Sequence, residues 1–145
     1  NGKLFQKKYY TNGVRNGFFE TYDKRGFLKS RYLYENGKKC GISEVYHPNG
    51  NIQTRCYLKG DKRDGYFEIY NTNGHLTSKC NYRNDKLHGL QEYHPRHTNE
   101  YYIIKNYRNG LLHGDSKTYD SCGVIVSHKI YKYGVVDKVI VGEET

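Results

Sequence analysis

The sequence has no methionine and no tryptophan, only two prolines, and no apolar run near the ~18–20 residues that a helix needs to cross a bilayer. Hydrophobic residues make up 35% of the chain and the mean hydropathy is −0.99, which is little aliphatic material for a compact two-layer domain. The missing methionine leaves open whether an N-terminal signal has been lost. These shortages give no candidate transmembrane helix and disfavour an ordinary globular core.

Aromatic residues replace the missing aliphatic ones. The chain contains 17 Tyr and 5 Phe, whereas disordered chains are poor in aromatic residues. A Tyr ring can bury apolar area while its hydroxyl stays in water. There are 16 Gly and no long segment with apolar residues at helical spacing. Tyr, Val, Ile and Thr favour strands, and Asn-Gly pairs favour tight turns. The composition therefore indicates an all-β protein.

The four cysteines, Cys40, Cys56, Cys80 and Cys122, are not spaced as a metal knuckle or a redox motif. They indicate reduced thiols in an intracellular, reducing compartment such as the cytoplasm or a virion. The net charge of +9 favours acidic partners, although a solvated surface explains it equally well.

Glycine and tyrosine recur with a period of 24 residues, which is the main signal in the sequence. One glycine series comprises Gly17, Gly41, Gly65, Gly89 and Gly114, and a tyrosine series comprises Tyr22, Tyr46, Tyr70, Tyr93 and Tyr119. Two further series are Gly2, Gly26, Gly50, Gly74 and Gly123, and Gly13, Gly37, Asp61, Asp85, Gly110 and Gly134. Because these series share one register, they indicate tandem copies of one structural element.

Each unit is interpreted as a β-hairpin. In the second unit we expect a first strand over about 41–46, a tight turn over 47–50 and a second strand over about 51–58. Asx and Gly residues supply the positive φ that a hairpin turn demands. The glycine that begins each first strand is expected to leave room for an aromatic ring of the next unit.

Alternation along each strand assigns residues to the two sides of the sheet. The first-strand residues expected on the buried side are Phe18, Glu20, Tyr22, Ile42, Glu44, Tyr46, Tyr66, Glu68 and Tyr70. The second-strand residues expected there are Leu28, Ser30, Tyr32, Tyr34, Ile52, Thr54, Cys56, Leu58, Leu76, Ser78, Cys80 and Tyr82. The opposite side carries Lys29, Arg31, Gln53, Arg55, Thr77 and Lys79, and it is expected to face solvent.

The expected fold is an elongated, twisted, single-layer antiparallel sheet of about five and a half hairpin units. The predicted units are 13–36, 37–60, 61–84, 85–109 and 110–133, with a partial unit at 1–12 and a cap and tail at 134–145. One extra residue near His97 predicts a longer turn, and 135–141 is expected to be a closing strand before the charged Glu143 and Glu144. The N-terminal end starts within a unit and is expected to be the open end, where a partner binds.

The pattern Tyr-x-x-Gly-x-x-x-Gly-x-x-x-x-Tyr-x-x-x-Gly, carried by 34–50, 82–93 and 107–123, resembles the MORN repeat in the variant form of bacterial and viral proteins. The resemblance implies an elongated hairpin sheet used for protein–protein contact, dimerisation or contact with acidic lipid. Such proteins include scaffolds, cytoskeletal organisers and antitoxin-like proteins. The chain departs from the pattern at Asp61 and Asp85, where the family has glycine.

No metal site, cofactor or catalytic residue is predicted. His88 and His113 occupy equivalent positions and should lie ~10 Å apart, too far to share a zinc ion. The same spacing puts Cys56 and Cys80 beyond disulfide reach. The acidic ladder Glu20, Glu44, Glu68 and Glu92 is better explained as a set of acceptors for Tyr hydroxyls or backbone amides than as acid–base pairs. His94 and His97 provide two ligands without a third.

The predicted partner-binding surface is a basic stripe of Arg31, Arg55 and Lys79, with Tyr57 and His128 on the same side. A solvated face paired with neighbouring acids is the alternative, and nucleic acid fits poorly because this side offers few stacking surfaces. We expect a non-enzymatic structural or protein–protein interaction scaffold, part of a larger assembly that includes the viral case, with self-association through a sheet edge or face as one mode. The alternatives are a peripheral anionic-phospholipid-binding module that uses the basic stripe, and an antitoxin-like binding protein.

Overall fold

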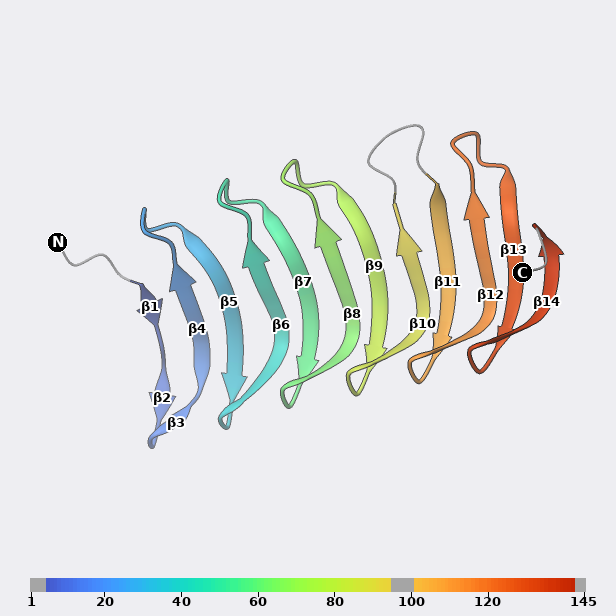
Figure 1. Cartoon of the computed structure of the whole chain (residues 1–145). Helices are drawn as coiled ribbons and strands as arrows, with labels where there is room; N and C mark the ends of the chain where they lie inside the picture. The colour runs from blue at the N-terminus through green and yellow to red at the C-terminus, as the bar shows by residue number, and fades with distance from the viewer. Residues whose placement is uncertain (1–4, 95–100, 143–145) are drawn as a thin grey trace.

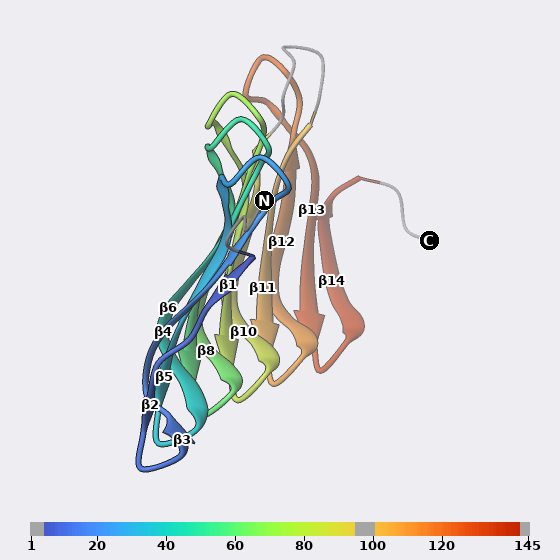
Figure 2. The ribbon, with the colours of Figure 1, turned by 90° about the vertical axis from the view of Figure 1, so that its left-hand side faces the viewer.

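The computed structural model describes residues 5–94 and 101–142, which form one open antiparallel sheet of 12 strands and a separate two-stranded ribbon. Strands lie beside one another in sequence order, so the chain runs steadily from one end of the sheet to the other (Figure 1). Figure 2 shows the sheet as a single twisted layer. The predicted all-β fold of tandem antiparallel hairpins is confirmed. No helix long and apolar enough to span a bilayer occurs in the described residues.

The strands of the main sheet are β1 (Gln6–Lys7), β4 (Gly17–Tyr22), β5 (Leu28–Glu35), β6 (Lys38–Tyr46), β7 (Ile52–Lys59), β8 (Lys62–Tyr70), β9 (Leu76–Arg83), β10 (Lys86–Tyr93), β11 (Tyr102–Arg108), β12 (Leu111–Tyr119), β13 (Ile125–Lys132) and β14 (Val135–Val141). The ribbon consists of β2 (Tyr10–Thr11) and β3 (Val14–Arg15). From β4 onward, even-numbered strands are the first strands of hairpins and odd-numbered strands are the second. The closing strand predicted over 135–141 is present as β14, whereas the turn near His97 and the two C-terminal glutamates lie outside the described residues.

The glycines near the start of the first strands lie at β-bulges. Pairing of β6 with β5 jumps from Arg31↔Glu44 to Leu33↔Cys40, so three residues of β6, beginning with Gly41, oppose one residue of β5. The same shift recurs in β8, β10 and β12. All five glycines of this series have positive φ, between 64° and 126°, a region that L side chains rarely adopt. The strand therefore continues through its glycine, and β6 starts at Lys38 rather than near 41 as predicted.

These glycines were expected to contact aromatic rings of the next unit. That prediction is wrong, because the rings that contact them belong to the preceding strand segment. An added Cβ at Gly17 or Gly65 would lie 3.2 Å from the Cβ of Tyr9 or Tyr57, and both tyrosines belong to the preceding strand segment. At Gly89 the same space is open. Positive φ is what all five glycines have in common, four of them lie at bulges, and ring packing against bare backbone is an addition at two of them.

Two kinds of turn join the strands, on opposite edges of the sheet (Figure 1). The two-residue turns are Asn36-Gly37, Gly60-Asp61, Asn84-Asp85, Asn109-Gly110 and Tyr133-Gly134, and both residues of each have positive φ, as type I′ turns require. We call the edge that they form the turn edge. On the other edge, the turns after β4, β6, β8 and β12 have five residues, as between β6 and β7, where the N–H of His47 donates to the carbonyl of Asn51 at 2.8 Å.

Each two-residue turn is hydrogen-bonded to the hairpin before it. The N–H of the second turn residue donates to a backbone carbonyl near the start of the preceding first strand: Gly37 to Arg15, Asp61 to Lys39 and Asp85 to Arg63 at 2.9 Å, Gly110 to Leu87 at 2.7 Å, and Gly134 to Leu112 at 2.8 Å. Where aspartate replaces glycine, its carboxylate accepts a second bond, from the N–H of Lys39 at 2.8 Å or Arg63 at 2.9 Å. The two departures from the family pattern therefore add contacts between units and keep the turn unchanged.

The side of the sheet predicted for the first-strand residues is wrong. Glu20, Glu44 and Glu68 directly oppose Arg31, Arg55 and Lys79, so the acidic and basic ladders lie on one face. Alternation orders the residues within one strand, but it does not fix how two strands are aligned. The second-strand assignment holds for Ser30, Tyr34, Leu58 and Cys80, each exposed by 8% or less. It is wrong for Thr77, which was expected to face solvent but is 6% exposed, with its hydroxyl donating to the carbonyl of Ile69 at 3.1 Å. Opposite Ser30 lie Thr21 and Val45, and Phe67 lies opposite Cys80.

Replacing Gly65 by alanine should destabilise the sheet more than replacing Gly89. Both substitutions force a side chain into positive φ, which costs about 1–3 kcal/mol, but only at Gly65 does the new methyl group meet Tyr57. Urea unfolding of the two variants measures the difference. A Gly89→Ala loss equal to or larger than that of Gly65→Ala would show that the contact with Tyr57 is not tight.

Asp85 should make the stability of the array depend on acid. The backbone N–H of Arg63, together with its side chain, holds the pKa of Asp85 below 3.8 in the folded chain. A carboxylate with a lowered folded-state pKa stabilises the fold above its unfolded pKa, and that contribution is lost as the pH falls through the folded value. The stability advantage of the wild type over Asp85→Asn at pH 6 should therefore shrink at pH 3. An advantage that is the same at both pH values, measured by urea unfolding, would contradict this assignment.

Candidate functional site

The predicted glutamate ladder is a structural network. Arg31, Arg55 and Lys79 each lie 3.2–3.4 Å from the glutamate on the neighbouring strand. The other carboxylate oxygen of each glutamate accepts a bond from the tyrosine two residues further on: Tyr22 at 2.7 Å, Tyr46 at 2.5 Å and Tyr70 at 2.8 Å. The expectation that these glutamates accept Tyr hydroxyls is confirmed. Each carboxylate is occupied on both sides.

The environment of this network keeps the hydroxyls protonated. Burial, and then the hydrogen bond to Glu44, raises the pKa of Tyr46 to about 12. The pKa of Tyr70 is raised by the same two causes, and that of Tyr22 chiefly by its bond to Glu20. A neutral phenol donating to a carboxylate is a stable pair, so this ladder fixes the rings in place and offers no free acid or base.

The predicted partner-binding residues are on one face, as expected, but most of their charge is already paired. His128 lies at the position equivalent to Lys79 and bonds the carboxylate of Asp115 through Nε2 at 2.7 Å. Tyr57 is 42% exposed and lies against the bulge at Gly65. The basic stripe stays a prediction, but its three cations face three carboxylates, which weakens their attraction for an outside anion.

A second set of basic residues flanks the turn edge. Its members are exposed and border the two-residue turns: Lys38, Lys59, Lys62, Arg83, Lys86, Arg108 and Lys132. None of them is within ion-pair distance of an acid in the described part of the chain. Equivalent residues of neighbouring units lie ~10 Å apart, because each unit adds two strands. Charge patterns along the strand faces do not reveal this row, because its residues lie beside the turns.

An aromatic groove of about 560 Å³ lies on the opposite edge, between the five-residue turns after β4 and β6. Its walls include Phe5, Tyr22, Phe27, Tyr46 and Pro48. Phe5 and Phe27 are each 57% exposed, although most aromatic rings of a single-layer sheet pack against neighbours. The two tyrosine hydroxyls point to their glutamates, so the rings present apolar surface to the groove.

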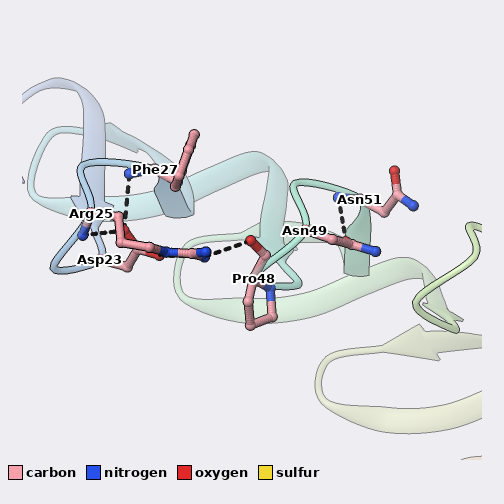
Figure 3. Close-up of polar contacts among 6 residues, drawn as sticks. All are labelled: Asp23, Arg25, Phe27, Pro48, Asn49 and Asn51. Carbon is pink, nitrogen blue, oxygen red and sulfur yellow. Dashed lines mark hydrogen bonds and ion pairs between the residues drawn. The ribbon is translucent and has the colours of Figure 1, made fainter.

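One hydrogen bond of Arg25 joins the two turns that border the groove (Figure 3). The guanidinium of Arg25 pairs with Asp23 at 3.1 Å, donates to the carbonyl of Pro48 at 2.8 Å and lies 4.9 Å from the ring centroid of Phe27. The N–H of Phe27 also donates to Asp23 at 3.0 Å. Backbone and guanidinium bonds lower the pKa of Asp23, the one acid among the described residues that line the groove. The negative charge of Asp23 is therefore paired with Arg25 within the turn.

Phe27 is the residue that sequence reasoning should have noticed. At the equivalent position the next two units have Asn51 and His75, and the fifth hairpin has Val124, each accepting the same turn-closing backbone bond. A phenylalanine that no turn geometry requires is a departure from the repeat. A comparison that looks only for residues common to all repeat units does not detect a residue that differs in one unit.

The cysteines and histidines form no metal site in residues 5–94 and 101–142, where no cluster of three possible ligands occurs. Cys56 and Cys80 are free thiols whose pKa burial raises. His94 packs against Tyr102, with ring centroids 5.3 Å apart. Its predicted companion His97 lies outside the described residues.

Residues 39–59 and 63–84 match the family model described as the MORN repeat variant. These segments cover β7, nearly all of β6 and β8, and β9, which include two of the bulges and the five-residue turns after β6 and β8. No curated protein matches the chain. Repeats of this family are generally associated with contact to proteins or membrane lipids and are generally non-enzymatic. These two segments are MORN repeats of the variant type, and the same bulge-and-turn geometry recurs along the sheet beyond them.

Proposed function

We propose that this chain is a non-enzymatic scaffold that binds a partner protein in the aromatic groove. The observation that carries the proposal is the groove itself: a preformed hollow lined by aromatic rings. Its volume of about 560 Å³ is within the usual range of ligand sites, and exposed aromatic residues in a pocket are typical anchors of protein interfaces. The four free thiols fit a reducing compartment.

The chemistry of the groove indicates its occupant. Apolar walls accept an aromatic or aliphatic side chain, and Lys29 lines the same hollow. Asp23, the one carboxylate among the described lining residues, is bonded to Arg25, so the positive charge of Lys29 favours an acidic ligand. The partner segment is therefore a short stretch with one large apolar residue flanked by Asp or Glu.

Rigidity supports the same conclusion. Arg25 joins the two turns, and the tyrosine hydroxyls are bonded within the sheet, so little side-chain freedom remains to be lost when a ligand binds. A preformed groove of this kind gives affinity to a single anchor residue, as interface hot spots do.

Peptides selected from a random display library on the wild-type chain should share an apolar anchor with acidic neighbours. Phe27→Ser should weaken their binding about tenfold or more, because it removes one wall of the groove. Val124→Ser, the same change at the equivalent position of another turn, should leave the affinity unchanged. Equal affinities for the two variants, or a library that yields no common anchor, would contradict the proposal.

A second candidate function is binding to anionic phospholipid through the turn edge. It is favoured by the row of unpaired cations that borders the two-residue turns, since each Lys or Arg near an anionic surface contributes about 1 kcal/mol. The stripe of Arg31, Arg55 and Lys79 is less suited, because glutamates already neutralise it.

Sedimentation with phosphatidylserine vesicles distinguishes the two basic surfaces. The triple variant Lys59→Gln, Lys62→Gln, Lys86→Gln should bind about tenfold more weakly, or worse. The variant Arg31→Gln, Arg55→Gln, Lys79→Gln loses the same number of charges and should bind nearly as the wild type does. A larger loss in the second variant would make the stripe the binding surface, and equal sedimentation with neutral vesicles would end this candidate function.

A further inference from the structure

A polar cavity of about 630 Å³ lies near the turn edge at β10, β11 and β12, far along the sheet from the aromatic groove. Its lining includes two arginines, Arg83 and Arg108, and two histidines, His88 and His113. Each pair occupies equivalent positions in successive units. At the histidine position earlier units have Cys40 and Asp64, and at the arginine position they have Glu35 and Lys59. These two neighbouring units are therefore the ones in which arginine and histidine occur together.

The backbone fixes both imidazoles in the same tautomer. Nδ1 of His88 accepts the N–H of Asn109 at 3.4 Å, and Nδ1 of His113 accepts the N–H of Tyr133 at 3.3 Å. An imidazole whose Nδ1 accepts a hydrogen bond carries its proton on Nε2. Each ring therefore presents an Nε2–H donor, whatever its charge.

The two guanidiniums are available for a ligand. Arg83 and Arg108 are exposed, and neither is within 4.0 Å of a carboxylate oxygen in the described part of the chain. The one carboxylate that lines the cavity, Asp115, is bonded to Nε2 of His128 at 2.7 Å. That bond lowers the pKa of Asp115 and occupies one oxygen of its carboxylate.

We propose that this cavity binds a phosphate monoester group. Its side chains present donors almost throughout: two planar guanidiniums that bind oxyanions with paired hydrogen bonds, and two imidazole N–H groups. A phosphate monoester carries close to two negative charges and several acceptor oxygens, which matches this set better than a carboxylate does. The group can belong to a soluble phosphorylated compound or to a lipid headgroup. The proposal does not rest on the protein-scaffold function or on the vesicle-binding candidate.

Titration of the full chain with inorganic phosphate, followed by amide NMR shifts against chloride at matched ionic strength, tests the site. Saturable shifts should centre on Gly89, Asn109 and Gly114. The double variant Arg83→Gln, Arg108→Gln should weaken binding about tenfold or more. Its matched control, Lys59→Gln, Lys132→Gln, removes the same charge at the same repeat position in units without the histidines, and it should bind phosphate as the wild type does.

Shifts that do not saturate would overturn the proposal, and so would equal losses in both double variants, which would mean general attraction to a basic edge. Glycerol 3-phosphate and vesicles that contain phosphatidic acid then separate the two sources of the group. Tighter binding of the soluble compound identifies a phosphorylated small molecule, and tighter binding of the vesicles identifies a headgroup. Binding to neither, although inorganic phosphate binds, would also contradict a monoester site.

Discussion

The hydrogen bond from each two-residue turn to the preceding hairpin links the units of this protein at the turn edge. A hairpin alone is marginal in water, and a single-layer sheet has no second layer to cover it. Here the turn amide of one unit donates to the start of the unit before, as from Gly37 to Arg15 and from Asp61 to Lys39. Both residues of the turn adopt positive φ. At the glycine bulge a few residues later, the pairing with the preceding strand shifts in register. The rest of the sheet is built on this pair of backbone constraints.

Much of this architecture could be predicted from the sequence, because backbone positions with positive φ are occupied by residue types that can be recognised in it. Glycine at positions such as Gly41 and Gly65 and Asx-Gly pairs at the turns mark positive φ, and their period gives the number and order of hairpins. The alignment between strands could not be predicted in this way. Side-chain alternation is the same for either alignment, so Glu44 was placed on the side opposite Arg55 although the two are direct partners.

The candidate sites were harder to predict, and for a different reason. A repeat is found by what its units share, whereas the aromatic groove and the polar cavity depend on residues that differ between units. Phe27 stands where other turns have Asn51 or His75, and His88 stands where another unit has Asp64. Residues that recur in successive units, such as Glu20, Glu44 and Glu68, bond to tyrosine and basic side chains within the sheet and hold it together. In this protein the residues that recur between units stabilise the sheet, and the residues that differ between units form the candidate binding sites.

The central claim is that the turn amides are bonded to the preceding hairpin and make the array a rigid platform. Amide hydrogen exchange of the folded chain, followed by NMR, tests it most directly. The amides of Gly37, Asp61, Asp85, Gly110 and Gly134 should exchange as slowly as neighbouring strand amides, although they lie in exposed two-residue turns. Exchange of these amides at the rate of an unprotected loop would contradict the account.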